Sequence, residues 1–391
     1  MEETTHTRNI GKRRMKKKTN PPPYMPLELI VQILSRLAVK SLLRFKCVCK
    51  SWLSLISHDP HFANSHFQIT ASTHTRKIMF ITSSLSDTLS FDFEVSIRNN
   101  TVIERPNPNF ITPLSDGLIE IVSSCRGFIF LHHNSSFYLW NPSTRVHKQI
   151  PLSPIELNVD VVDAYDCFYL YGFGYDQLRD DYLVVSVSFD PTLVHCYSRL
   201  EFFSLRDNTW KVLEGTRFPY MNDYGDPRVG SLFNGAIHWL AYHHDLVKNV
   251  ILAFDLTERK LLEMPFLDGS GHEIQNCELW VFGEFLSLWA MDYGNRSVEI
   301  WVMEEYKVLS SWTKALVLPI DGTPSRYISP ICSTKSGDIV ARNGENELLK
   351  YNDEGQLLEH ESYWFDQLET GFQVTMYTES LLSLPSGNVQ A

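Results

Sequence analysis

A repeat of about 50 residues constrains the fold of this chain more than any other feature. Five short apolar segments with the pattern of β-strands end at Asn141, Ser204, Asp255, Met303 and Asn352. Their ends are 63, 51, 48 and 49 residues apart. Several strands within each repeat of this length are typical of the blades of a β-propeller. We therefore predict an all-β, propeller-like domain over residues 68–391.

Glycines and leftover strands indicate how such a propeller is built and closed. Gly127, Gly235, Gly283 and Gly337 each precede an apolar run, where glycine suits a tight turn. We expect five units near residues 117–150, 167–214, 229–265, 277–312 and 327–363. Strand-like segments around residues 77–95 and 372–384 remain. A closing blade that joins these two segments gives about six blades and leaves no open sheet edge.

Residues 24–67 show a helical period instead. Pro26 suits the first position of a helix, and apolar residues recur at spacings of three and four from Leu27 to Leu37. Ser41 is a candidate cap for a second short helix, and a third should stop at residues 58–60. We expect three helices in this stretch.

The apolar content of the first helix exceeds what a single buried face needs. Leu29 and Ile33 extend the apolar stripe well round the helix. So short a unit lies near the lower limit for burying a core of its own. Some of its apolar surface should therefore meet another body, and the pattern leaves open whether this is the chain's own next domain or a separate partner.

Two segments of this helical stretch closely resemble the F-box. They have a proline-led first helix, an Ile-Leu pair, a Leu-Leu turn and a Val-Cys-Lys-x-Trp sequence, at residues 25–37 and 41–52. Met25 stands where leucine is commonest, and Ala38 stands where plant members often have proline. The resemblance implies binding to the Skp-type adaptor of a cullin–RING ubiquitin ligase. We expect an α+β multidomain chain with a basic, disordered tail at 1–23, a three-helix F-box at 24–67 and the propeller-like domain at 68–391.

The same resemblance marks a set of adaptor-binding residues, some of which would instead hold the three helices together. They are Pro26, Leu27, Leu29, Ile30, Ile33, Leu34, Leu37, Leu42, Leu43, Val48, Cys49 and Trp52.

The β-rich region resembles the plant F-box-associated interaction domain, which is kelch-like. The matching segments are residues 124–127, 139–144, 172–176, 181–185, 234–240 and 377–384. The Gly-Gly doublet of true kelch blades is missing, so a kelch label would be loose. Together the two resemblances imply a substrate-recognition subunit of an SCF (Skp–cullin–F-box) ubiquitin ligase, which bridges the adaptor to a target protein and needs no active site.

No motif in the sequence indicates catalysis, a metal site or a cofactor. Cys47 and Cys49 stand two positions apart, which on a helix turns their thiols roughly 200° from each other and away from one zinc ion. Gly172-x-Gly174 lacks the third glycine of a dinucleotide loop. Two alternatives stay open: a binding scaffold outside a ligase, and a propeller enzyme whose groups converge from distant loops.

Aromatic loop residues are the best candidates for contact with a target protein. Tyr220 and Tyr224 lie in a tyrosine-rich link between two units. Tyrosine offers a large contact area with a polar tip. A packed loop between blades is the alternative interpretation of the same residues.

Net charge, hydropathy and cysteine content narrow the possible partners of the protein and its location in the cell. The net charge is −11, and the basic residues of the tail leave an even more acidic body, which argues against nucleic acid as a ligand. No run approaches the roughly 20 apolar residues of a membrane span. Seven cysteines without a paired spacing fit a reducing compartment. The run Lys12–Lys18 resembles a nuclear import signal, although a solvated basic tail has the same composition. We expect a cytoplasmic or nuclear protein.

Overall fold

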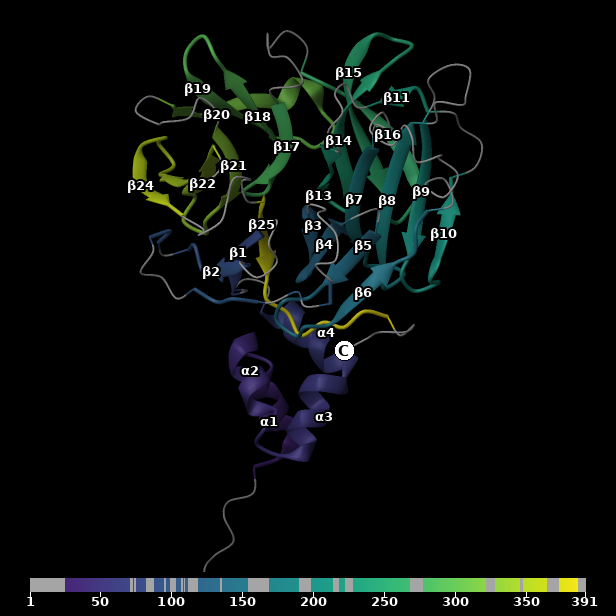
Figure 1. The fold of residues 1–391 in the computed structure, drawn as a ribbon, viewed down its shortest axis with the longest axis vertical. Helices are drawn as coiled ribbons and strands as arrows, with labels where there is room; N and C mark the ends of the chain where they lie inside the picture. Colours follow the sequence, from purple (N-terminus) through teal and green to yellow (C-terminus); the bar gives the residue numbers. More distant parts are fainter. Residues whose placement is uncertain are drawn as a thin grey trace, which may run out of the picture.

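The computed structural model has four helices at one end and a ring of β-sheets at the other (Figure 1). It describes residues 25–70, 73, 75–81, 88–94, 96–98, 103–106, 108, 110–111, 119–133, 136–153, 169–189, 198–213, 218–221, 228–267, 277–320, 328–344, 347–363 and 373–385. The predicted tail with its import signal, and Tyr224, lie outside these residues.

The helices form a small helical domain, residues 27–69. They are α1 (Leu27–Leu34), α2 (Val39–Phe45), α3 (Lys50–His58) and α4 (Pro60–Ile69). The third helix ends at the predicted place, but a fourth helix, which we did not predict, follows at once. The residues that end α3 also start α4. The Asp59 carboxylate accepts hydrogen bonds from the backbone N–H groups of His61 (2.9 Å) and Phe62 (3.1 Å), and Pro60 has no N–H group that needs a partner.

The ring is a six-bladed β-propeller, as the repeat predicted. The closing blade holds β1 (Arg76–Ile81), β2 (Leu89–Phe91) and β25 (Gln373–Thr378). The first blade holds β3 (Ile119–Cys125), β4 (Phe128–His133), β5 (Ser136–Trp140) and β6 (His147–Ile150). The second blade holds β7 (Tyr169–Asp176), β8 (Asp181–Phe189), β9 (Ser198–Ser204), β10 (Thr209–Val212) and the short parallel strand β12 (Arg228–Val229).

The other three blades follow in chain order. The third holds β11 (Tyr220–Met221), β13 (Ser231–Phe233), β14 (Ala236–His243), β15 (Lys248–Asp255) and β16 (Lys260–Pro265). The fourth holds β17 (Cys277–Phe282), β18 (Phe285–Asp292), β19 (Ser297–Met303) and β20 (Trp312–Pro319), with a 3₁₀ turn at Leu309–Ser311. The fifth holds β21 (Ile328–Ser333), β22 (Ile339–Asn343), β23 (Glu347–Tyr351) and β24 (Leu357–Ser362).

The ring closes by pairing strands from opposite ends of the domain. Strand β1 runs antiparallel to β25, from Arg76 opposite Thr378 to Ile81 opposite Gln373. This sheet accommodates the two segments that the five repeats left over. Because this sheet joins the two ends of the domain, the ring of blades is closed.

Tight turns connect the first two main strands of several blades. Arg126 and Gly127 have φ angles of 50° and 87°, and Asn234 and Gly235 have 47° and 73°. Two successive residues with positive φ are typical of a two-residue hairpin turn that matches the strand twist. The glycines in the sequence therefore stand where the backbone needs them.

The core lies between neighbouring blades. The buried residues form clusters that each join two adjacent sheets. Between the second and third blades, Trp239 donates from Nε1 to the Tyr171 carbonyl at 2.7 Å. A Cβ on Gly230 would lie 2.7 Å from Cε2 of this tryptophan, so only glycine fits there. Among the described helices, none is long and apolar enough to cross a membrane.

Candidate functional site

The helical domain leaves apolar side chains in solvent. Leu27, Leu29 and Ile33 of α1 are 53%, 48% and 51% exposed. Val48, which lies two residues before α3, and Leu53, which lies within α3, are also exposed. The propeller therefore covers only part of this domain, and a substantial apolar surface remains open to a partner.

A groove between α1 and α3 adds depth to this surface. It has a volume of about 480 Å³ and is lined by Leu27, Val31, Trp52, Leu55 and Pro60, together with polar groups of α3. The Trp52 ring packs edge-on against Phe45, with centroids 5.7 Å apart. An apolar side chain of a partner could fill such a groove.

The structure separates the predicted adaptor-binding residues by exposure. Six are exposed: Pro26, Leu27, Leu29, Ile33, Val48 and Cys49. Four are partly buried: Ile30, Leu37, Leu43 and Trp52. Leu34 and Leu42 are 1% and 0% exposed.

Leu34 and Leu42 lie in the interior because their sides of α1 and α2 face the rest of the helical domain and the propeller. In this conformation they present no surface to a partner, and they hold the helices together. Met25 and Leu53 are exposed and were not in the predicted set. Met25 was part of the F-box-like segment but was left out of the set, and Leu53 directly follows the second such segment.

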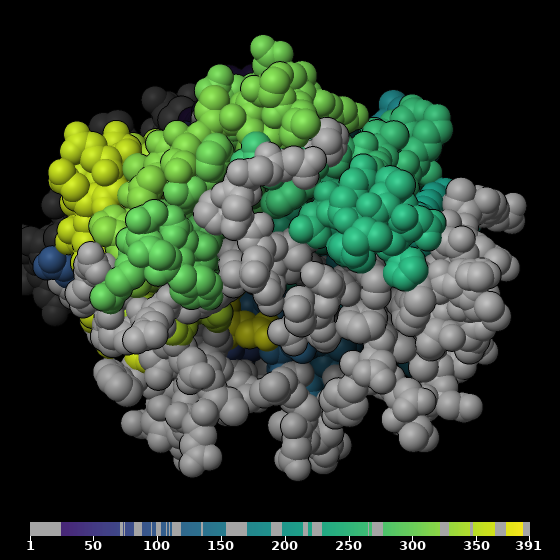
Figure 2. Space-filling view, turned by 90° about the horizontal axis from the view of Figure 1, so that it is seen from above, coloured from purple at the N-terminus to yellow at the C-terminus, as the bar shows by residue number. Residues whose placement is uncertain are grey.

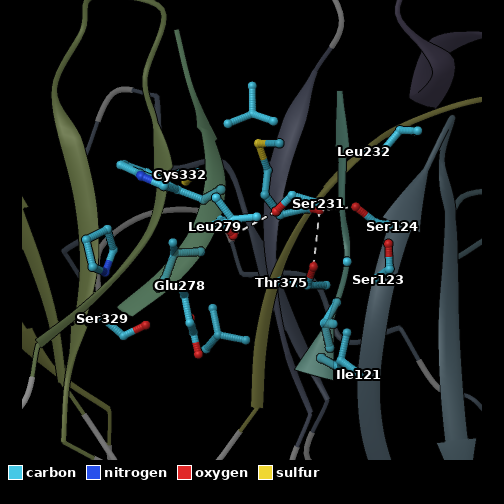
Figure 3. Close-up of a pocket in the computed structure, with 18 of the residues that line it drawn as sticks. Ile121, Ser123, Ser124, Ser231, Leu232, Glu278, Leu279, Ser329, Cys332 and Thr375 are labelled. Carbon is cyan, nitrogen blue, oxygen red and sulfur yellow. Dashed lines mark hydrogen bonds between the residues drawn. The ribbon is translucent and has the colours of Figure 1, made fainter. Parts of the chain in front are cut away.

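A cavity of about 1060 Å³ lies at the centre of the propeller. It is lined by the innermost strands β3, β7, β13, β17, β21 and β25. Figure 3 shows small hydroxyl side chains, among them Ser123, Ser231 and Thr375, reaching it from separate strands. The Ser231 hydroxyl donates to the Leu279 carbonyl at 2.7 Å, so part of this lining ties neighbouring blades together.

The far end of this channel carries charged groups of both signs, because Arg342, which pairs with Ser329 near the start of β21, lines it together with two glutamates. Glu120 and Glu278 line it near the first residues of β3 and β17, on the side away from the helical domain. Glu120 lies 3.1 Å from the Nδ1 atom of His132. Viewed from that side, teal atoms of the third blade and green atoms of the fourth stand around a hollow (Figure 2). This arrangement can bind by hydrogen bonds and charge.

Tyr220, a candidate contact for a target, is tied into the third blade. Its hydroxyl donates to Glu263 at 2.9 Å, and its ring packs edge-on against His243 with centroids 5.1 Å apart. Burial and the Glu263 carboxylate raise the pKa of Tyr220. Burial acts to raise the pKa of Glu263, but hydrogen bonds from Lys248 and Tyr220 outweigh it and hold that pKa low. Tyr220 is therefore partly buried and held by contacts within the third blade.

One buried histidine in the third blade also has a structural environment. His238 is fully buried, with Nε2 2.8 Å from the Tyr306 hydroxyl and Nδ1 3.3 Å from the Ser231 carbonyl. These contacts suit a neutral ring that donates from Nδ1 and accepts at Nε2. Burial lowers the pKa of His238 to about 4.

The described residues offer no group of three His, Cys, Asp or Glu side chains placed to hold a metal ion. Cys47 and Cys49, the pair considered for zinc, are both free and exposed.

Comparisons with known proteins agree on two regions. Residues 77–355 match the family model described as an F-box associated beta propeller domain, and residues 23–63 match the F-box domain. An F-box/kelch-repeat protein of Arabidopsis thaliana, At3g23880, is 31% identical over 309 residues, which cover 76% of this chain and 80% of the relative. The F-box protein CPR1 of the same plant is 26% identical over 351 residues, covering 84% of this chain and 82% of that protein.

Solved structures resemble the chain only distantly. The fucose-binding lectin of the fungus Aleuria aurantia, described as a six-bladed β-propeller, aligns with a TM-score of 0.36 and 13% identity. That alignment covers 78% of this chain and 96% of the lectin.

Proposed function

Because this chain belongs to the family of F-box proteins with an F-box-associated β-propeller, we propose that it is the substrate-recognition subunit of an SCF ubiquitin ligase. In this role the helical domain binds a Skp-type adaptor and, through it, the cullin–RING complex. The propeller holds a target protein, which is then ubiquitinated and degraded.

The observation that supports this proposal best is the uncovered apolar surface of the helical domain. Leu27, Leu29 and Ile33 are each about half exposed, although the helical domain contacts the propeller through α4. We propose that the exposed and partly buried members of the predicted set, with the groove between α1 and α3, contact the adaptor. Leu34 and Leu42 shape this surface from within.

The proposed mechanism needs no catalytic group in this chain. Holding a target beside the ubiquitin-charged enzyme raises the effective concentration of its lysines, and this accelerates transfer. The ring of the propeller supplies a rigid platform for the target. We propose the side away from the helical domain for this contact, because an adaptor bound to the helices leaves that side free.

Affinity purification from plant cells tests the proposal. The full chain is expressed with the proteasome blocked, and bound proteins are identified by mass spectrometry. We expect a Skp-type adaptor and a cullin with the normal chain, and neither with a Leu29→Asp, Ile33→Asp variant that retains its folded propeller. Recovery of targets without a cullin would instead favour the scaffold alternative and overturn the ligase role.

We also propose a cytoplasmic and nuclear location, with import directed by the basic run Lys12–Lys18. The test is a fluorescent fusion of the full chain in which Lys16, Lys17 and Lys18 are replaced by alanine. We expect the nuclear share of fluorescence to fall, and an unchanged distribution would refute the import signal.

A further inference from the structure

The segment after β25 runs between the propeller and the helical domain. Residues 379–385 cross beneath the first blade beside α4, where they are drawn in yellow (Figure 1). Leu381, Leu382 and Leu384 are 6%, 3% and 4% exposed. They belong to the same buried cluster as Phe62 of α4. The C-terminal part of the chain therefore fills the junction of the two domains.

A buried asparagine holds this segment to the first blade. The side-chain amide of Asn141 lies 3.2 Å from the carbonyl oxygens of both Ser380 and Leu382. Its oxygen accepts from the backbone N–H of Ser143 at 2.9 Å. The Ser380 hydroxyl donates to the Arg126 carbonyl at 3.0 Å. Because Asn141 and Ser380 are both fully buried, breaking this set of bonds would leave buried polar groups without partners.

The side chain of Arg126 bridges from this anchor to α4. Its Nη2 donates to the side-chain oxygen of Asn64 at 2.9 Å. Its guanidinium lies 4.8 Å from the centre of the Phe67 ring and 3.9 Å from that of Tyr175. Asn64 and Phe67 belong to α4, whereas Tyr175 belongs to the second blade. One cation thus joins the helical domain to two blades through a hydrogen bond and two cation–π contacts.

A chain of charges closes the other side of the junction. Lys40 of α2 lies 2.8 Å from Glu104, which lies 2.6 Å from Lys77 of β1. Lys77 in turn lies 2.7 Å from Glu379. Burial acts to lower the pKa of Lys77, but hydrogen bonds to the two glutamates outweigh it and raise that pKa. Since Lys77 is only 7% exposed at its side chain, salt screens these pairs less than it screens a surface pair.

We propose that residues 379–385, anchored by Asn141, and the side chain of Arg126 form a clamp that fixes the helical domain to the propeller as one body. If the proposed ligase function holds, this makes Arg126 a positioning residue for ubiquitin transfer. A fixed junction presents a bound target to the ubiquitin-charged enzyme in one orientation. With a loose junction the target would take many orientations, and ubiquitin transfer to each lysine would be slower.

Hydrogen exchange on the full chain tests the clamp without any partner. We compare Arg126→Ala with Arg206→Ala, a matched control on the turn between β9 and β10 whose guanidinium donates to the Arg179 carbonyl. Amides of α4 and of residues 380–384 should exchange at least about tenfold faster in Arg126→Ala than in the control, with the central blade strands unchanged. Equal exchange in the two variants would overturn the clamp. If Arg126→Ala does not fold, Asn64→Ala removes the same bond from the other side.

A reconstituted ligase tests the positioning role, because the choice of lysines that receive ubiquitin would not change through a loss of stability alone. Lysines of the chain that receive ubiquitin are mapped by mass spectrometry for the normal chain and for Arg126→Ala. We expect adaptor affinity and the melting temperature of the propeller to stay the same within error, and modification to spread from a few lysines to many. An unchanged lysine pattern would refute positioning. Failure of the normal chain to bind the adaptor would refute the ligase function, while the exchange result would still decide the clamp.

Discussion

Replacing Leu27, Leu29 and Ile33 together with alanine should weaken adaptor binding while leaving the fold intact. All three side chains belong to α1 and are 53%, 48% and 51% exposed. Leu29 and Ile33 are four positions apart and share one side of the helix, whereas Leu27 lines the groove toward α3. The triple change therefore removes apolar contact on both sides of α1.

The expected loss follows from these exposed fractions. Full burial of a leucine or isoleucine side chain contributes about 1.5–3 kcal/mol, so covering the exposed half contributes about 0.8–1.5 kcal/mol for each residue. Alanine keeps its Cβ, and we therefore expect a total loss of about 2–3 kcal/mol. This corresponds to an increase in Kd of about 30- to 150-fold.

Calorimetric titration of the purified chain with a recombinant Skp-type adaptor measures this change. The matched control replaces Val317, Leu357 and Leu358, which are exposed to a similar extent on the outer strands of the propeller. We expect the control to bind the adaptor like the normal chain. A triple α1 variant that keeps its melting temperature and loses less than about threefold in affinity would refute the assignment of this surface.

Three further predictions concern stability. Leu34→Ala should lower the free energy of unfolding of the helical domain by about 2–5 kcal/mol in urea titrations, because Leu34 is 1% exposed. Gly230→Ala should destabilise the propeller by about 1–3 kcal/mol, since its new Cβ would lie 2.7 Å from Cε2 of Trp239. The control is Gly294→Ala, whose new Cβ would lie 3.3 Å from one side-chain oxygen of Asp292 and which should be near neutral in the same titration. Because burial lowers the pKa of His238 from 6.5 to about 4, the unfolded chain takes up a proton first as the pH falls below 6.5. Unfolding should therefore become easier by about 2 kcal/mol between pH 7 and pH 5, and His238→Gln should remove this part of the pH dependence.

The sequence predicted the propeller because its repeats are local. Each blade is a run of hairpins, and the turns that define them, such as Asn234–Gly235, need backbone angles that favour glycine. Trp140 and Trp289, which lie within strand-like runs of the sequence, are 1% exposed and form part of the blade core. The closing blade was also predictable, because two leftover strands had to pair somewhere.

Other features depend on contacts between distant residues and left little local signal. Asp59 and Pro60 mark both the end of α3 and the start of α4, so the second role was missed. Leu34 looks like its neighbours in the sequence, and only the packed structure shows that it faces inward. Arg126 meets Asn64, which is 62 positions away in the sequence. The two-residue strand β12 is too short to leave a pattern.

The pairing of β1 with β25 has a consequence for synthesis on the ribosome. Residue 378 is translated about 300 residues after residue 76, yet the two must lie opposite each other in one sheet. Until that late strand emerges, β1 has no partner on that side, and the ring stays open with its apolar flanks accessible to chaperones. The helices are made long before, so if the proposed contact with the adaptor holds, a nascent chain could bind it while the ring is still unfinished.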